Sequence, residues 1–173
     1  MKLEFTEIEK NPGLLPDSVY AYIQKNRFNI QVAEINPTYA DGESLHQQYD
    51  VPYEMELNCL VVEGRRNEDV HYAAVVVPYG KKASMNAKVR TPLNAKKVSF
   101  ADLDYVTEKT GMEYGSITPV GLPEDWMILL DSSVLNQESV IVGSGKANGK
   151  LMLPSVLFTK MPNCILVDGL AKD

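Results

Sequence analysis

Apolar residues recur at helical spacing in several segments of the chain. Val19, Tyr22 and Ile23 fall on one face of a helix predicted over residues 17–26, with Asp17 as its N-cap. Helical spacing or helix-start signals also predict helices over residues 41–48, 83–89 and 99–110, a helical turn at residues 132–135, and a final helix from Pro154 onward.

Other segments show the patterns of strands. Residues 70–77 read Val-His-Tyr-Ala-Ala-Val-Val-Val, a nearly continuous apolar run typical of a central strand. The intervening helices are short, which argues against a doubly wound parallel sheet and favours one mixed domain over residues 1–173. The remaining predicted strands cover residues 28–35, 55–63, 98–100, 126–131, 138–142, 151–153 and 164–167, after an irregular lead-in over residues 1–15 and with a charged loop at residues 64–69.

Composition places the chain among soluble globular proteins, with 45% hydrophobic and 23% charged residues in a length of 173. No apolar run reaches membrane-spanning length and no signal-peptide pattern opens the chain, so we expect a cytoplasmic protein. Cys59 and Cys164 form no metal-binding pattern with His46 and His71. Free buried thiols are expected, and a cysteine nucleophile paired with a histidine is the alternative. His71 is expected to be a surface residue.

Charge is unevenly distributed. Residues 79–100 carry six cations and no acid, so this segment is +6 whereas the chain as a whole is −6. Such a segment either binds a polyanion or forms a solvated surface.

The most unusual stretch is residues 110–123, which holds three glycines and two prolines. Gly111 is expected to cap the helix before it, and Ser99 to cap that helix at its start. A loop of this kind either lets backbone amides face a ligand or forms a rigid connection. A second glycine turn, Gly143-Ser144-Gly145-Lys146, lacks the spacing of a phosphate-binding loop and joins two strands rather than a strand and a helix.

Four segments, in order, resemble the YbaK/prolyl-tRNA synthetase-associated editing domain family of aminoacyl-tRNA deacylases. Residues 110–123 are similar to the family loop T-G-x-x-x-G-[GS]-[IV]-x-P-[FVL]-G. Residues 128–135 resemble the strand and short helix after it. Residues 140–157 resemble the closing strand, turn and last helix, and residues 57–80 the paired central strands. The resemblance covers about residues 30–160 and leaves the N-terminal lead-in and helix, residues 1–27, outside it.

The resemblance implies an α/β fold of mixed α+β type, with a curved, largely antiparallel sheet or partial barrel surrounded by short helices. It also implies metal-independent and cofactor-free hydrolysis of the ester of mischarged tRNA, with the ribose hydroxyl of the substrate taking part and backbone groups of the loop holding the aminoacyl moiety. The residues that the resemblance assigns to catalysis are Gly115, Ser116, Ile117, Thr118, Pro119 and the position of Asn58. Further substrate contacts are expected at Gly111, Gly121, Gly143 and Ser144.

Asn58 departs from the family pattern, which places a lysine there in an [IV]-[VA]-K-[ST]-L strand. An asparagine offers only neutral hydrogen bonds where a lysine offers a cation. Either activity is lowered, or another cation replaces the lysine, or the chain is a non-catalytic relative. Lys81, Lys82 and Lys146 are the candidate replacements.

The implied partner is the acceptor end of a mischarged tRNA, with an aminoacyl-tRNA synthetase as a candidate second partner. Phosphate contacts are expected from Lys81, Lys82, Lys88 and Arg90. The sequence thus predicts a trans-acting aminoacyl-tRNA deacylase. The alternative is a non-catalytic module that binds tRNA ends, nucleotides or amino acids.

Overall fold

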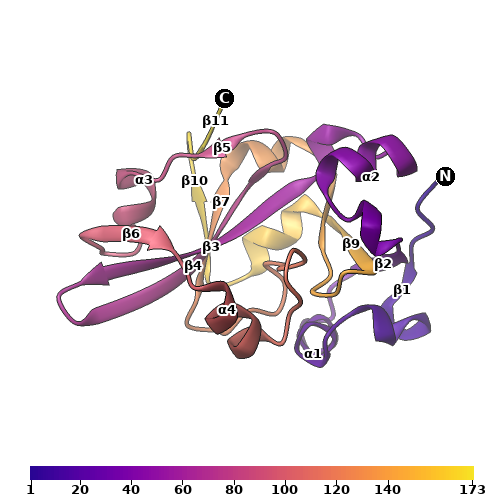
Figure 1. Cartoon of the computed structure of the whole chain (residues 1–173), viewed down its shortest axis with the longest axis horizontal. Coiled ribbons are helices and arrows are strands. Elements are labelled where there is room, and N and C mark those ends of the chain that lie inside the picture. Colours follow the sequence, from indigo (N-terminus) through magenta and orange to yellow (C-terminus); the bar gives the residue numbers. More distant parts are fainter.

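The computed structural model describes residues 1–173 and is built around two β-sheets (Figure 1). One has four strands in the order β1-β2-β9-β8 and the other has five in the order β10-β7-β4-β3-β6, while β11 pairs with β5. The strands are β1 (Thr6–Glu7), β2 (Gln31–Glu34), β3 (Leu57–Arg66), β4 (Asp69–Pro78), β5 (Lys82–Ala83), β6 (Lys97–Phe100), β7 (Met127–Asp131), β8 (Ser139–Gly143), β9 (Gly149–Pro154), β10 (Cys164–Val167) and β11 (Ala171–Lys172). The α-helices are α1 (Asp17–Asn26), α2 (Gly42–Tyr49), α3 (Ala87–Arg90) and α4 (Leu103–Thr110), and 3-10 helices occur at Ile8–Lys10, Pro12–Leu14, Pro37–Tyr39, Tyr53–Met55, Ser132–Asn136 and Ser155–Lys160.

The pairing confirms a mixed α/β fold with largely antiparallel strands. Only β4–β7 and β10–β7 run parallel, and every other strand pair is antiparallel. The two sheets do not close into a barrel, although an isolated bridge joins Glu56, just before β3, to Ile141 on β8. That bridge brings the edge of the four-stranded sheet to the start of the long β3–β4 hairpin.

Strand β4 is central, as its apolar run predicted. It lies between β3 and β7 in the five-stranded sheet. Ala74 and Val76 face a core cluster of 27 buried residues, whereas Val75 and Val77 face a second cluster of 10. Burial on both faces explains why this strand has no alternation of polar and apolar residues.

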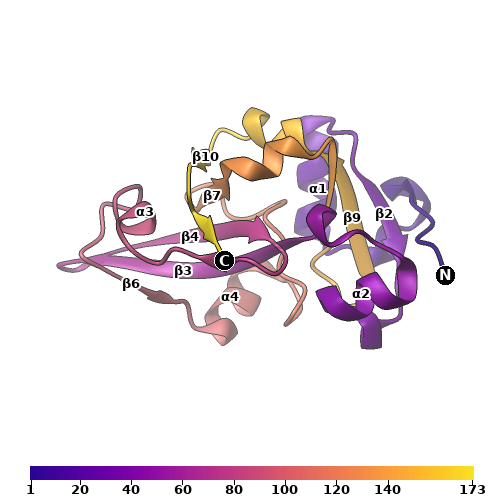
Figure 2. The same cartoon turned by 90° about the horizontal axis from the view of Figure 1, so that it is seen from above.

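The larger core cluster includes buried residues of both sheets, such as Leu151 on β9 and Ile128 on β7. Helix α1 adds Val19 and Ile23 to it and lies beside β2 and β9 (Figure 2). The predicted bounds of α1 are confirmed, because its apolar residues recur at the spacing that one buried face requires.

Two helix ends follow the sequence signals. Asp41 caps α2, since its Oδ1 accepts a hydrogen bond from the Ser44 amide at 2.9 Å. Gly111 ends α4 in the left-handed conformation with φ of 71°.

The expected caps Ser99 and Asp17 were wrong. Ser99 belongs to β6, where it pairs with Glu63 of β3, and Asp102 caps α4 instead by accepting from the Asp104 amide at 3.1 Å. Asp17 is the first residue of α1 and makes no capping hydrogen bond.

The helix predicted over residues 83–89 was also wrong. Ala83 lies in β5 and pairs with Ala171 near the C-terminus, so only residues 87–90 form α3. A distant strand therefore overrides the local helical pattern, as tertiary contacts often do.

Several boundaries shifted. The loop expected at residues 64–69 is a tight turn at Asn67 and Glu68, because β3 runs to Arg66 and β4 starts at Asp69. The strand predicted over residues 28–35 is shorter, the final helix is a 3-10 helix, and the lead-in contains β1. No helix of the protein has the length and hydropathy that a membrane crossing needs.

Candidate functional site

The loop rich in glycine and proline connects α4 to β7 and is anchored by buried side chains. Met112 is 2% exposed and Thr118 is fully buried, and the Thr118 amide donates to the Met112 sulfur at 3.5 Å. Gly115, in contrast, is exposed and has φ of 79°, a conformation that other residues adopt only with strain. The anchored loop therefore presents its G-x-x-x-P segment from a fixed base.

The second glycine turn holds this loop in place. Gly145 donates from its amide to the Ser116 carbonyl at 2.9 Å, and Glu113 donates from its amide to the Gly145 carbonyl at 2.7 Å. A Cβ on Gly143 would lie 2.7 Å from the Ser116 carbonyl oxygen. The close approach of two backbones thus explains Gly143, whereas Gly145 has φ of 92° and a Cβ there would lie 2.7 Å from the Pro16 side chain.

A cavity of about 410 Å³ lies between the loop, the start of β3 and the N-terminal end of α2. It brings together four of the residues that the family resemblance singled out, namely Asn58, Gly115, Ile117 and Gly143. The other residues that line it are Ala40, Asp41, Gly42, Leu45, Glu56, Leu57, Cys59, Leu60, Tyr79, Leu103, Tyr114, Ile141 and Lys150.

Backbone donors are available at this cavity. The amides of Gly115 and Ile117 donate to no other group of the protein, whereas the Ser116 amide between them donates to the Glu113 carbonyl at 3.0 Å. Unpaired N–H groups at a cavity wall can bind an oxygen atom that carries partial or full negative charge.

Glu56 is a residue of the cavity that the sequence did not single out. It is 4% exposed, and neither carboxylate oxygen has a hydrogen-bond partner. The pKa of the Glu56 carboxyl is raised to about 8, chiefly by burial; Lys150 opposes this shift, while the charges of Asp41 and Glu43 add to it. A buried carboxyl without a partner costs stability, which suggests a role in binding.

Lys150 is the only lysine or arginine that lines the cavity. It lies on β9 opposite Gly143 of β8, and its ammonium group makes neither an ion pair nor a hydrogen bond within the protein. Burial lowers its pKa, and the charge of Glu56 opposes this shift. No pattern in the sequence marks this lysine, because it occupies an ordinary strand position.

The three lysines expected to replace the missing cation lie elsewhere. Lys146 donates from Nζ to the Gly13 carbonyl at 3.2 Å, and Lys81 forms an exposed ion pair with Asp173. Lys82 is exposed on β5. None of them lines the cavity that contains Asn58.

The remaining loop residues of the resemblance lie outside the cavity wall. Ser116, Thr118 and Pro119 are buried in the base of the loop. Ser144 is buried and donates from Oγ to the Leu14 carbonyl at 2.7 Å, and Gly111 is the exposed helix cap described above.

Both cysteines are free thiols, as predicted, but they are half-buried rather than fully buried. Burial raises the pKa of Cys59 to about 12 and that of Cys164 to about 11, the opposite of the shift that activates a cysteine nucleophile. His71 is exposed, and His46 has its Nδ1 2.7 Å from the Val51 carbonyl oxygen. The structure contains no group of three or more side chains suited to hold a metal ion.

The cations of the basic segment do not line the cavity. Lys81, Lys82, Lys88 and Arg90 are all exposed. Arg90 also lines a groove of about 400 Å³ that contains two further cations, Arg66 and Lys96, and no acidic side chain.

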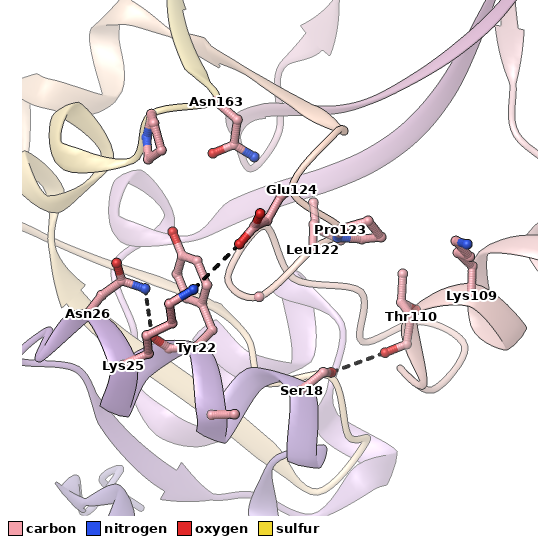
Figure 3. A pocket seen from close by; sticks show the side chains of 13 residues that line it. Ser18, Tyr22, Lys25, Asn26, Lys109, Thr110, Leu122, Pro123, Glu124 and Asn163 are labelled. Atoms are coloured by element: carbon pink, nitrogen blue, oxygen red, sulfur yellow. Dashed lines mark hydrogen bonds and ion pairs between the residues drawn. The ribbon is translucent and has the colours of Figure 1, made fainter.

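A larger depression of about 890 Å³ lies between α1, the end of α4 and residues 121–124 (Figure 3). Gly121 lines it. Its charges are exposed, and Lys25 pairs with Glu124 across it at 3.6 Å. Ser18 donates from Oγ to the Thr110 carbonyl at 3.2 Å.

Comparison with known proteins gives one family and a shared fold. A family model described as "Aminoacyl-tRNA editing domain" matches residues 36–159. The hypothetical protein APE2540 has a similar structure, with a TM-score of 0.78 at 20% identity over 90% of this chain and 100% of that one. A structure described as "a putative trans-editing enzyme for prolyl tRNA synthetase" gives a TM-score of 0.75 at 16% identity over 92% of this chain and 99% of that one. None of the curated proteins matches the sequence.

Proposed function

Because the chain belongs to the aminoacyl-tRNA editing domain family, we propose that it is a trans-acting deacylase that hydrolyses the ester of mischarged tRNA. The observation that carries the proposal is the cavity of about 410 Å³ beside the G-x-x-x-P loop. It combines unpaired backbone donors at Gly115 and Ile117 with a single cation, Lys150. A pocket of this size with a few polar groups suits a small aminoacyl moiety better than a nucleic-acid helix.

The donors suit the chemistry of ester hydrolysis. Water attacks the ester carbonyl, the carbonyl oxygen gains negative charge, and the ribose oxygen leaves with a proton when the intermediate collapses. The amides of Gly115 and Ile117 stabilise the developing negative charge, because they belong to a loop whose base is already fixed. No side-chain nucleophile is required.

Lys150 supplies the positive charge that Asn58 lacks. Both residues line one cavity, and the Lys150 ammonium has no partner in the protein. It can therefore bind the ribose or phosphate end of the substrate. Removal of such a charged contact costs on the order of 1.5–3 kcal/mol, which corresponds to roughly 10–150-fold in rate.

The tRNA would contact one exposed side chain at the cavity and the exposed cations of the basic segment. Tyr114 lines the cavity and is 71% exposed, so its ring can stack on the terminal base. We assign phosphate contacts to Lys81, Lys82, Lys88 and Arg90, which are exposed cations of the basic segment.

The second candidate is a non-catalytic module that binds tRNA ends, nucleotides or amino acids in the same cavity. Asn58 favours it, because a neutral amide replaces the cation of the family pattern. This candidate predicts ligand binding without ester hydrolysis.

The decisive experiment measures amino-acid release from tRNA(Pro) charged with alanine, cysteine or serine. We expect release by the natural protein, a decrease of about 10–150-fold in Lys150→Met, and no change in Lys146→Met, whose lysine lies outside the cavity. Activity in Asn58→Lys alone would favour the non-catalytic candidate. No release by any of these proteins would contradict the deacylase proposal.

A further inference from the structure

Glu56 lines the cavity, but the ester hydrolysis described above does not use it. Its carboxyl is almost fully buried and neither oxygen has a partner. In a folded protein such a group is rare, since burial without a hydrogen bond costs roughly 1–3 kcal/mol. The missing partner is therefore expected to come from the ligand.

We infer that Glu56 binds the free α-ammonium group of the aminoacyl moiety, so that the site selects substrates with an unblocked amino acid. This inference rests on the proposed function, because it assigns a part of the same substrate. An aminoacyl ester has one cation near its carbonyl carbon, and a carboxylate is its natural acceptor.

The surroundings of Glu56 favour a cation rather than a neutral donor. Asp41 also lines the cavity, and its charge acts on Glu56 together with that of Glu43. Asp41 is already engaged as the cap of α2, where both of its oxygens accept from Ser44. Asp41 thus adds negative potential, while neither oxygen of the buried Glu56 is used by a hydrogen bond within the protein.

An aromatic side chain also lines the cavity that contains Glu56. Tyr79 lines the cavity and donates from its amide to the Glu56 carbonyl at 2.8 Å. Its ring stacks on Tyr53, with centroids 5.5 Å apart, and Tyr53 in turn stacks on His46. The face of an aromatic ring attracts ammonium groups, so carboxylate and ring act in the same direction.

Lys150 and Glu56 face one cavity without forming an ion pair with each other. A ligand can therefore use both, placing its ammonium at Glu56 and an electronegative group at Lys150. Since the pKa of Glu56 is about 8, the carboxyl of the empty cavity is mostly protonated at pH 7. A bound ammonium stabilises the ionised form, and the carboxyl releases its proton on binding.

The test compares two non-hydrolysable probes that differ in one group. The first is the alanyl amide of 3′-amino-3′-deoxyadenosine, and the second is its isobutyryl amide, in which a methyl group replaces the ammonium. Affinities are measured by NMR titration of the full-length protein at pH 7.5. The variants are Glu56→Gln, which keeps the shape, and Glu54→Gln, a change at an exposed neighbour.

We expect the natural protein and Glu54→Gln to bind the alanyl probe at least about tenfold more tightly than the isobutyryl probe, a factor typical of one charged contact. Glu56→Gln is expected to bind the two probes alike. Equal binding by the natural protein, or an unchanged preference in Glu56→Gln, would overturn the inference. Amino-acid release from tRNA together with either of these results would leave the deacylase proposal standing.

Discussion

Two hollows of this molecule differ in a way that their size does not reveal. The depression beside α1 is about 890 Å³, and the cavity beside the G-x-x-x-P loop is about 410 Å³. In the depression, Lys25 and Glu124 pair with each other while remaining exposed. In the cavity, Glu56 is buried without a partner and Lys150 is unpaired.

This contrast shows what distinguishes a binding site from a surface hollow. Polar groups that satisfy each other or face water need no ligand, whereas buried polar groups without partners store free energy that a ligand can recover. The smaller hollow has that property, and it also holds the unpaired amides of Gly115 and Ile117. It is therefore the hollow to which we assign function.

The largest effect is expected from a methyl group at the wall of the cavity. In Gly143→Ala the new Cβ would lie 2.7 Å from the Ser116 carbonyl oxygen, so the loop backbone must move. We expect a loss of about 1–3 kcal/mol in stability, typical of overpacking, and at least a tenfold lower deacylation rate. Thermal unfolding and amino-acid release measure the two effects.

Two controls belong to this variant. Gly13→Ala places its Cβ where nothing lies within 4 Å, and Lys25→Gln alters only the larger depression. Both should keep full deacylation activity. A loss of activity in Lys25→Gln comparable with that of Gly143→Ala would reverse the comparison between the two hollows.

A smaller effect is expected from the exposed cations of the basic segment, which line neither hollow. Replacing Lys81, Lys82, Lys88 and Arg90 together by glutamine should weaken tRNA binding and reduce its dependence on salt, by about 0.7–0.9 in the logarithmic slope for each phosphate that the protein no longer neutralises. The matched control replaces Lys25 and Lys109 of the larger depression. The phosphate-binding proposal would fail if the fourfold variant bound tRNA with unchanged affinity and salt dependence.

The smallest effect concerns stability and pH. The pKa of Glu56 is raised to about 8 in the folded protein, above the value of roughly 4.3 for an unperturbed carboxyl. The folded state therefore binds more protons, and the stability linked to Glu56 is complete below about pH 4 and is lost as pH rises toward 8. Glu56→Gln removes this loss, so it should unfold about 2–8 °C above the natural protein at pH 8 and show a much smaller difference at pH 5.

Thermal unfolding scans at both values of pH measure this effect. Glu124→Gln, in the larger depression, is the counterpart, because its carboxylate is exposed and paired on the surface. Its melting temperature should follow that of the natural protein across the range. An equally small difference between Glu56→Gln and the natural protein at pH 5 and pH 8 would contradict the assigned burial of a protonated carboxyl.

Much of the fold could be predicted from local patterns. The bounds of α1, the cap of α4 at Gly111 and the central place of β4 follow from spacing, backbone conformation and hydrophobicity. The predictions failed where a remote partner decided the local structure. Ala83 became a strand residue because it pairs with Ala171. Ser99 caps no helix because it pairs with Glu63, within the short strand that was predicted over residues 98–100.

The candidate site also combines residues that local patterns reveal with residues that only remote contacts bring together. The loop of the site could be found from the sequence. The left-handed backbone conformation at Gly115 favours glycine, and glycines can be read directly from the sequence. Glu56 and Lys150 could not be found, since each occupies an ordinary position before or within a strand. Glu56 and Lys150 acquire their surroundings in the cavity only when the two sheets pack together in the folded protein.

By itself, then, the amino-acid sequence determined the longer strands, the main helices and the loop that carries the family resemblance, because these depend on properties of neighbouring residues. The tertiary structure alone decided which cation lies near Asn58 and which carboxyl lacks a partner. The bridge between Glu56 and Ile141 brings the start of β3 to the hairpin that carries Lys150. Electrostatic energies depend on distance and burial in space, and neither quantity can be read from positions along a chain.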